Sequence, residues 1–411
     1  MIRTTSLAIG ASLAILAAGA AHAQANRAEV IHWWTSGGES AAVQELANGY
    51  KAAGGTWVDN AIAGGEAARA AAINRIVGGN PSTAAQFNTS QQFLDIVKGG
   101  MLNNVDDVAR KNDWEKILPA SILKAIKIDG HFYAVPVNIH MPAWFWYSKS
   151  AFEKAGIKAE PQTPDEFFAA LDKLKAAGIT PLAFGGQPWQ EKLVFDALLA
   201  HVGGPDLYLK VYRDRDAKAI ASPAFKNVLT SFKRLKGYTD AGAPNRNWND
   251  ATSMVISGKA GVQIMGDWAK GEFQAARQTA GKEFGCFPGF GPKSPYIIDG
   301  DVFVFPKTTD AAAIKSQQLL ATVMTAPATQ VAFNNKKGSI PIRTDVDAKS
   351  MDVCAQTGLQ AMKDTARQLP NSAMLVPPDV GGEVQDIVTK YWNTNQSADD
   401  AAKAISAAIK G

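Results

Sequence analysis

The sequence predicts an exported α/β protein with two lobes, on the basis of three observations. Strand-like and helix-like segments alternate from residue 30 onward, which is the rhythm of a parallel sheet covered by helices. The chain has 411 residues and 46% of them are hydrophobic, enough for two separate cores. An extended segment without a flexible linker occupies residues 131–147, as expected for two lobes joined by a hinge. A single large domain is the alternative that the pattern alone leaves open.

The first part of the chain carries three strand–helix pairs in succession. Apolar runs predict the strands, and apolar residues at helical spacing predict the helices that follow them. The predicted pairs are 30–34 with 42–50, 57–62 with 67–77, and 81–88 with 93–97. Because ligands of parallel sheets bind at the carboxyl ends of the strands, we expect the site to include residues 34–39 and 88–90.

The pattern changes after Gly130. Residues 131–140 have strand composition and residues 141–147 continue it, so this stretch predicts one long extended crossing. A second α/β unit follows the crossing. Its predicted segments are helices at 164–177 and 192–201 and further elements at 250–258 and 265–280.

Residues 1–23 predict a cleaved secretion signal. Arg3 gives the start a positive charge, residues 7–21 are apolar and small, and Ala21-His22-Ala23 fits a cleavage site. The apolar stretch is short for a membrane span, although a retained anchor is the alternative. No second apolar run of spanning length follows. We therefore expect the mature protein to be soluble and exported.

The charge of the chain excludes some classes of partner, and its cysteine content predicts a disulfide. The formal net charge is +4, and removal of Arg3 with the signal leaves +3, with the charges scattered along the chain. This pattern predicts no nucleic-acid or lipid-surface partner. Cys286 and Cys354 are the only cysteines, and in an oxidising compartment we expect them to form a disulfide.

The most informative motif lies at the end of the first predicted strand. Trp33 and Trp34 are adjacent, so one indole can pack in the core while the other faces a crevice. Glu39 places a carboxylate nearby, after the small residues Thr-Ser-Gly-Gly. An aromatic face beside a carboxylate is the chemistry that holds a sugar. The CH face of the sugar ring stacks on the indole, while its hydroxyls donate to the carboxylate.

Six motifs occur in order along the mature chain. They are HWWTSGGE at 32–39, AVPVNIH at 134–140, GGQPWQ at 185–190, ISGKAG at 256–261, MGDWAK at 265–270 and KGSIPIR at 337–343. With these motifs the sequence resembles the extracellular solute-binding proteins of bacterial ABC sugar importers, most closely the periplasmic glucose-type sugar-binding proteins. The resemblance runs over essentially the whole mature chain.

The resemblance implies a periplasmic binding protein-like α/β fold, in which two discontinuous lobes are joined by a hinge and hold the ligand in the cleft between them. The expected lobes are residues 24–138 with 299–345, and residues 139–298 with 346–411. Hinge crossings are implied near Asn138, Asp299 and Thr344. The two cysteines stand where such proteins carry a pair, which supports the disulfide.

The resemblance also implies a function in binding rather than catalysis. A monosaccharide or small glycoside would be captured by lobe closure and delivered to an inner-membrane ABC permease, with no cofactor and no metal. A chemoreceptor is a further candidate partner, and a monomer is the default for such proteins.

The same resemblance implies which residues touch the sugar. Tryptophans would form the walls, and polar groups from both lobes would bind the hydroxyls. The implied set is Trp33 or Trp34, Glu39, Asn88, Asn138, Trp189, Gln190, Trp248, Trp268, Asp299 and Lys337. The alternative for each tryptophan is a place in a core, where aromatic residues are common.

Three positions depart from the glucose-type pattern. Asn88 replaces a basic residue, Ile297 replaces an amide, and Leu375 stands where close relatives carry a histidine. A polar ligand loses affinity when a buried hydroxyl has no partner. We therefore predict that the preferred ligand is not free glucose bound in the usual way. Another aldose, a deoxy sugar or a glycoside with an apolar face toward Ile297 and Leu375 is the expectation.

A secreted glycoside-processing enzyme is the competing class. Such enzymes need two carboxylates flanking the bond, and Glu39 with Asp267 or Asp299 would supply a pair. The sequence fixes no separation for these groups, and it carries no Gly-x-Ser-x-Gly elbow or phosphate-binding glycine loop. Its histidines show no metal-ligand spacing. Ligand binding without catalysis is therefore the stronger hypothesis.

Overall fold

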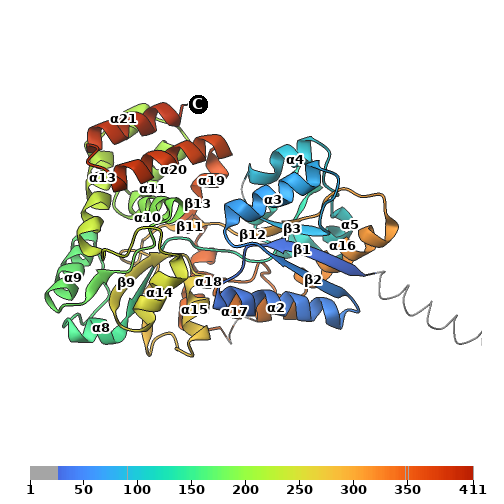
Figure 1. The fold of residues 1–411 in the computed structure, drawn as a ribbon, viewed down its shortest axis with the longest axis horizontal. Coiled ribbons are helices and arrows are strands. Elements are labelled where there is room, and N and C mark those ends of the chain that lie inside the picture. Colours follow the sequence, from blue (N-terminus) through green and yellow to red (C-terminus); the bar gives the residue numbers. More distant parts are fainter. Residues whose placement is uncertain (1–25, 90, 348, 350, 411) are drawn as a thin grey trace, which may run out of the picture.

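Two bodies of chain lie side by side in the computed structural model of the protein (Figure 1). The structure describes residues 26–410 except 90, 348 and 350, so the predicted signal peptide, residues 1–23, lies outside the described residues. Each body is built around its own large sheet and carries its own helices. The predicted α/β fold with two lobes is confirmed. We call the body with the five-stranded sheet the first lobe and the body with the four-stranded sheet the second lobe.

The first lobe is organised by a mixed five-stranded sheet. Its strands, in spatial order, are β2 (Thr56–Ala61), β1 (Arg27–His32), β3 (Ala84–Asn88), β12 (Asp301–Val304) and β6 (Ala134–Pro136). β1 is parallel to β2 and to β3, as predicted, whereas β12 is antiparallel to both β3 and β6. The parallel arrangement predicted from the first three strand–helix pairs is therefore confirmed, but the sheet as a whole is mixed because β12 adds an antiparallel strand. The reason is that β12 begins opposite the carboxyl end of β3, where Asp301 pairs with Asn88 after the chain has returned from the second lobe.

Helices cover both faces of this sheet. Figure 1 shows α3 and α4 on one side and α2 and α17 on the other. The helices of the first lobe are α2 (Gly37–Ala52), α3 (Gly65–Val77), α4 (Leu94–Lys98), α5 (Asp106–Lys111), α6 (Trp114–Ile117), α7 (Ala120–Ile126), α16 (Ala311–Met324) and α17 (Pro327–Lys337). α2 buries Ala42, Leu46 and Tyr50 along one face, which is the helical spacing that predicted it.

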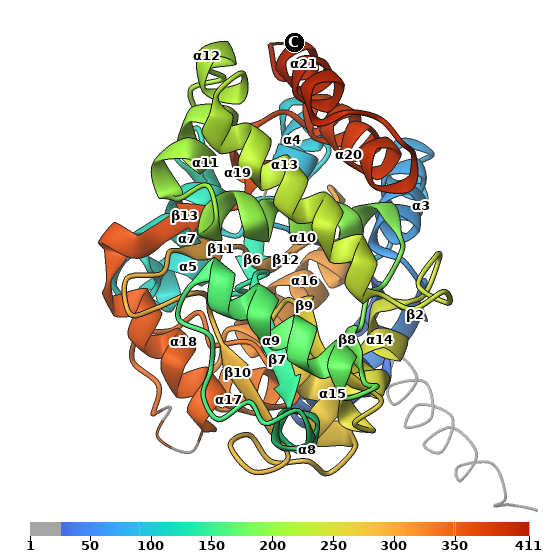
Figure 2. The same ribbon diagram turned by 90° about the vertical axis from the view of Figure 1, so that its left-hand side faces the viewer.

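The second lobe faces the viewer in Figure 2. Its sheet has the order β10 (Phe284–Phe287), β7 (Trp144–Ser148), β9 (Ala260–Met265) and β8 (Thr180–Leu182). β7 is antiparallel to both neighbours, and β8 is parallel to β9. Its helices are α8 (Lys149–Lys154), α9 (Pro164–Ala176), α10 (Pro188–His201), α11 (Pro205–Tyr212), α12 (Ala217–Ile220), α13 (Pro223–Leu235), α14 (Trp248–Ile256), α15 (Ala269–Ala275), α18 (Val353–Lys363), α19 (Ser372–Leu375), α20 (Pro378–Asn393) and α21 (Ala398–Ala408).

The remaining regular elements are short. They are the strand pairs β4 (Lys127–Ile128) with β5 (His131–Phe132) and β11 (Tyr296–Ile298) with β13 (Gln368–Pro370), and the single-turn helices Gln91–Phe93, Lys236–Tyr238 and Thr365–Arg367. Two predicted segments are corrected here. Residues 131–147 divide into β5, β6 and β7 because the chain leaves the first sheet after Pro136 and enters the second at Trp144. Residues 265–280 contain the end of β9, a turn and α15.

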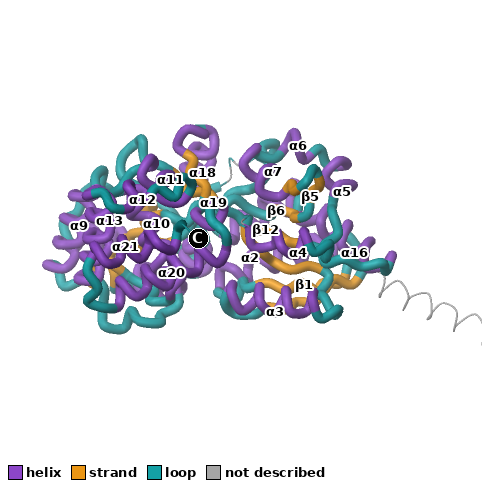
Figure 3. The backbone as a smooth tube through the Cα atoms, turned by 90° about the horizontal axis from the view of Figure 1, so that it is seen from above, coloured by secondary structure: helices purple, strands orange, loops and turns teal. Residues whose placement is uncertain are grey.

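The chain passes between the lobes along segments that run side by side. The backbone N–H of Val137 donates to Asp301 (3.0 Å), that of Ile139 to Ile340 (2.9 Å), and that of His140 to Asp299 (2.9 Å). Seen from above, the two lobes meet at a waist that is narrower than either lobe (Figure 3). Residues far apart in sequence are therefore brought together at the junction of the two lobes.

A disulfide joins Cys286, in β10, to Cys354, in the first turn of α18. The predicted disulfide is confirmed. It ties α18, which follows the last passage between the lobes, to the second sheet. Among the residues that the structure describes, no helix is both long and apolar enough to span a membrane.

Candidate functional site

A buried ion pair lies where α2 and α17 meet the second lobe. Ser36 caps α2 and places Glu39 in its first turn, while α17 ends at Lys337 because Gly338 adopts a left-handed conformation (φ 90°). The Lys337 Nζ lies 3.1 Å from the Glu39 Oε1, and the two side chains are 2% and 8% exposed. Charges this deeply buried require a partner. The two residues predicted from opposite ends of the chain therefore meet.

Two tryptophan rings approach this ion pair, and a third stands beside one of them. The Lys337 Nζ lies 5.7 Å from the ring centre of Trp34 and 5.8 Å from that of Trp268. Trp34 is 1% exposed and packs in the core of the first lobe. Trp268 is partly buried, and its ring lies directly over Gly266, where any Cβ would fall 2.2 Å from the ring. The Trp189 ring lies 6.5 Å from the Trp268 ring, so two of the three tryptophans predicted from the second lobe stand together.

Trp33 turns away from Trp34, as the alternation of a strand predicts. It is partly buried, and its ring rests near Gly65 while the guanidinium of Arg69 lies 5.5 Å from the ring centre. Trp33 is thus the indole that leaves the core of the first lobe. Trp34 is the indole that fills it.

His140 links the two lobes through carboxylates. Its Nε2 lies 2.8 Å from the Asp301 Oδ2 at the start of β12, and its Nδ1 lies 2.5 Å from the Asp267 Oδ1 after β9. Both ring nitrogens must donate for both contacts to be hydrogen bonds, so the ring is the charged imidazolium. Burial alone would lower the pKa of His140, but the two carboxylates raise that pKa to about 9. The Trp268 ring stands edge-on to the imidazole at 5.0 Å.

The Asp301 carboxylate accepts hydrogen bonds from three amide side chains. Asn138 donates to its Oδ2 (2.8 Å), and Asn88 and Gln86 donate to its Oδ1 (3.2 and 3.1 Å). Burial opposes ionisation, yet His140 holds the pKa of Asp301 below its usual value. The predicted residues Asn88 and Asn138 therefore meet on a carboxylate that the sequence reading did not select.

Asp299 lies two residues before Asp301 and is partly exposed. Thr89 donates to its Oδ1 (3.0 Å) and Asn371 to its Oδ2 (3.1 Å). Burial and the nearby charge of Asp301 raise the pKa of Asp299, whereas the hydrogen bond from the backbone N–H of Gly300 lowers it. The net result is a pKa of about 6. Asp299 is thus an acceptor whose charge changes near neutral pH.

Arg69 is a site residue that sequence reasoning missed. It stands on α3, partly buried, and its Nη1 reaches the Asn88 Oδ1 only at 3.5 Å. Among the described residues no carboxylate lies within ion-pair distance of its guanidinium, whereas Lys337 has one such carboxylate and His140 has two. Burial lowers the pKa of Arg69, and Glu66, Asp299 and Asp301 act against that effect. The sequence feature that could have identified Arg69 is its place in the predicted helix, one turn after Gly65.

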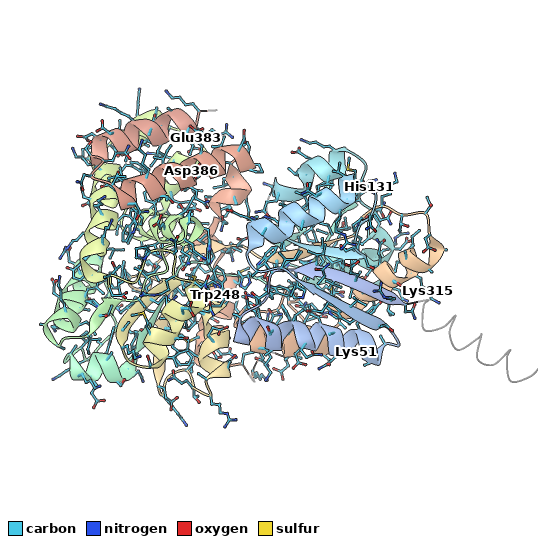
Figure 4. All side chains as sticks on the ribbon, viewed as in Figure 1. Lys51, His131, Trp248, Lys315, Glu383 and Asp386 are labelled. Atoms are coloured by element: carbon cyan, nitrogen blue, oxygen red, sulfur yellow. A yellow bond between two sulfur atoms is a disulfide. The ribbon has the colours of Figure 1, made fainter. Side chains whose placement is uncertain are left out.

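Two predicted residues lie apart from these contacts. Gln190 is 1% exposed, and its amide donates to the Gln187 side chain and to the Arg246 carbonyl. Trp248 begins α14 and lies near the junction of the lobes, whereas the labelled Lys51 and Lys315 lie on the far side of the first lobe (Figure 4).

The structure also shows where the residues that depart from the glucose-type pattern lie. Ile297 is 3% exposed and belongs to the core of the second lobe, so the prediction that it faces the ligand is wrong. Its burial follows from the pairing of β11 with β13, which places Ile297 opposite Leu369. Leu375 is partly buried against the same core. Asn371, at the start of this segment, supplies an amide to Asp299 instead.

The charged groups of the site are bound mainly to one another: Lys337 to Glu39, and His140 to Asp267 and Asp301. Within the described part of the chain, no group of three or more His, Cys, Asp or Glu side chains is placed to hold a metal ion. The site instead offers aromatic rings, one unpaired guanidinium and one partly exposed carboxylate. Such groups suit a neutral ligand with an apolar face and several hydroxyls.

Comparison with known proteins agrees with this chemistry. The profile of the family described as bacterial extracellular solute-binding protein matches residues 34–331. A probable sugar-binding periplasmic protein of Brucella suis is 39% identical, with 98% of this chain and 97% of the relative covered. A protein of the same description from Rhizobium meliloti is 38% identical, with 99% and 98% covered.

Solved structures share the fold at lower identity. A chitin oligosaccharide binding protein superimposes with a TM-score of 0.80 at 19% identity, covering 93% of this chain and 98% of that protein. Maltose-bound MalE3 of T. maritima gives a TM-score of 0.79 at 18% identity, covering 93% and 99%.

Proposed function

Because this chain belongs to the bacterial extracellular solute-binding protein family, we propose that it captures a sugar between its two lobes and delivers it to an ABC permease. The observation that carries the proposal is the site itself. Both lobes contribute to one set of contacts, in which aromatic rings stand beside charged groups. The relatives described as sugar-binding periplasmic proteins, which match this chain along nearly its full length, support a sugar as the ligand.

In the proposed mechanism the two lobes close around the sugar and do not alter it chemically. Trp268 and Trp189 of the second lobe receive the sugar ring, and Trp33, Asn88, Arg69 and Asp299 bind its hydroxyls as the lobes approach. A ligand favours the closed form only to the extent that it binds that form more tightly. Of the carboxylates that the enzyme hypothesis would use, Glu39 and Asp267 are each already held by a cation, and Asp299 accepts from Thr89 and Asn371, which supports binding over catalysis.

The remaining parts of the proposal concern place and partners. The chain is secreted by its first 23 residues and works in the periplasm as a monomer. Its lobes comprise residues 24–138 with 299–345 and residues 139–298 with 346–411. An inner-membrane permease receives the closed form, and a chemoreceptor is a second candidate partner.

Calorimetric titration of the mature protein, refolded free of carried-over ligand, tests the function. The panel comprises D-glucose, D-galactose, D-xylose, L-arabinose, L-fucose and methyl β-D-galactoside. We expect one sugar to saturate at one-to-one stoichiometry with micromolar affinity, about −8 kcal/mol. Heat that continues with product formation would instead indicate an enzyme. Glucose binding tighter than every other sugar would contradict the predicted departure from the glucose-type pattern.

Sugar affinity is expected to fall as the pH drops through about 6, the pKa of Asp299. An ionised carboxylate accepts hydroxyl hydrogen bonds, and its protonation removes that acceptor. If only the ionised form binds, affinity at pH 5 is about tenfold weaker than at pH 7.5. Titrations across this range check the profile, and Asp299→Asn should make it flat. A wild-type profile that is flat from pH 5 to 7.5 would remove Asp299 from the ligand contacts.

Arg69→Gln is expected to weaken sugar binding about tenfold, because a hydrogen bond from a charged donor contributes about 1.5 to 3 kcal/mol. Arg75→Gln is the matched control. Arg75 lies on the same helix but is bound to Glu29 at 2.7 Å. Equal affinities of the two variants in calorimetry would show that the Arg69 guanidinium does not touch the ligand.

A further inference from the structure

Three glycines form a backbone-to-backbone contact beside the ion pair. A Cβ added at Gly38, in α2, would lie 2.5 Å from the carbonyl carbon of Gly271 in α15. A Cβ at Gly271 would lie 2.7 Å from the carbonyl oxygen of Lys336, and one at Gly338 would lie 2.4 Å from that of Asp267. Real side chains do not make contacts this short with backbone. The two helices and the end of α17 therefore approach as closely as they do only because these positions lack a Cβ.

The contact joins the two lobes. α2 packs on the first sheet together with α17, whereas α15 packs on α14, which in turn packs on β9 of the second sheet. A polar contact accompanies the glycines, because the backbone N–H of Gly38 donates to the Oε1 of Glu272 at 2.8 Å. The first N–H groups of a helix have no partner within the helix, and a carboxylate at that end is favourable. Glu272 of the second lobe therefore binds the amino end of a first-lobe helix.

Each glycine stands next to a residue of the proposed site. Glu39 follows Gly38, Lys337 precedes Gly338, and Trp268 lies one helical turn before Gly271. When the glycine contact forms, it fixes where Glu39 and Lys337 of the first lobe stand relative to Trp268 of the second. None of the three glycines has a side chain to offer a ligand, so any effect they have on binding acts through these neighbours.

We propose that Gly38, Gly271 and Glu272 are positioning residues that form the closure contact of the protein, brought together when a sugar is captured. This inference rests on the proposed function. The glycines set how closely the lobes can approach, and Glu272 holds α2 once they do. Because a ligand shifts an open–closed equilibrium only through the difference between its affinities for the two forms, a barrier to full closure lowers affinity without removing a ligand contact.

Alanine substitutions at two adjacent positions of α2 test the proposal. Gly38→Ala introduces the 2.5 Å collision with Gly271, whereas a Cβ at Gly37 meets only the Glu272 Oε2 at 3.6 Å, an ordinary contact. Neither glycine has a positive φ, so alanine strains neither backbone. Both substitutions also lie in the same helical turn and change helix propensity alike.

We expect Gly38→Ala to weaken binding of the sugar that saturates the wild type at least tenfold, and Gly37→Ala to change it less than twofold. Small-angle X-ray scattering should show the wild type and Gly37→Ala becoming more compact with that sugar, and Gly38→Ala failing to do so. Glu272→Gln should give an intermediate loss of affinity. Equal affinity and equal compaction of the two alanine variants would overturn the proposal.

Thermal unfolding without sugar is a second test of the proposal, independent of the affinity measurement. A contact made only on closure leaves the melting temperature of ligand-free Gly38→Ala equal to that of Gly37→Ala. A marked fall for Gly38→Ala alone would mean that the contact belongs to a fixed part of the hinge, which also overturns the proposal. Failure of the wild type to bind any sugar would count against the proposed function, whereas the comparison of the two alanine variants reports on the glycine contact.

Discussion

Replacing His140 by alanine is expected to lower the free energy of unfolding by about 3 to 5 kcal/mol, the usual cost of removing one partner from a buried ion pair. His140 is 3% exposed, and its two ring nitrogens bind Asp267 and Asp301, which are 5% and 2% exposed. The variant leaves both carboxylates buried without their cation. Asp301 keeps the amides of Asn88 and Asn138, and Asp267 keeps the backbone N–H of Met141, but none of these groups carries a positive charge.

His131→Ala is the matched control for this variant. His131, labelled in Figure 4, also contacts a carboxylate, that of Asp106, but its side chain is 54% exposed. An exposed pair of this kind contributes about 1 kcal/mol or less. Urea unfolding of the wild type and both variants at pH 7 measures the difference. Equal losses for the two histidines would show that the buried pair contributes no more than a surface pair.

The pH dependence of the wild type gives an independent check on His140. Its pKa is raised in the folded state from 6.5 to about 9, so the folded protein binds the proton more tightly than the unfolded chain. The resulting stability is complete below pH 6.5 and is lost as the pH rises through about 9, a difference of about 3 kcal/mol. Urea unfolding between pH 6.5 and 9.5 should show this decline in the wild type. It should be absent from His140→Ala.

Trp268→Ala is expected to weaken sugar binding at least tenfold while the protein remains folded. The ring is partly buried, stands against His140 and Lys337, and faces Trp189 across 6.5 Å. Removing it deletes an aromatic surface for the sugar ring and leaves its polar neighbours more exposed to water. Calorimetry with the sugar that saturates the wild type measures the loss, and circular dichroism checks the fold.

Trp57→Ala is the control for the loss of an indole. Trp57 lies on β2, at the edge of the first sheet, and is also partly buried. We expect its replacement to change stability but not affinity. If Trp268→Ala binds the sugar as tightly as the wild type, the aromatic wall of the second lobe must be formed by other residues, and the proposed binding mode would have to be abandoned.

The two sets of variants separate stability from binding. His140 holds the lobes together through charge, so its loss is expected mainly in unfolding. Trp268 and Arg69 face the proposed ligand position, so their loss is expected mainly in affinity. Gly38 has no side chain to offer the ligand, and its backbone N–H binds Glu272 across the lobes, so the effect of its replacement is expected through closure.

Local features of the sequence were sufficient for much of the first lobe. The helical spacing of Ala42, Leu46 and Tyr50 and the apolar run before Trp34 led to α2 and β1 because such periodicities reflect which face of an element is buried. The alternation of Trp33 and Trp34 between outside and core followed from strand geometry in the same way. The disulfide followed from the presence of only two cysteines in a chain predicted to be secreted.

The sequence alone determined the fold class, the paired cysteines and the aromatic and acidic motif at 33–39. Only the tertiary structure decided which charges meet. His140 is separated from Asp267 by 127 residues and Glu39 from Lys337 by 298, so no local periodicity could pair them. The antiparallel course of β12, the place of Arg69 beside Trp33 and the contact of Gly38 with Gly271 were likewise decided by the way the two lobes pack. Local patterns record burial on one element, whereas the identity of a distant partner depends on how the chain returns from the other lobe.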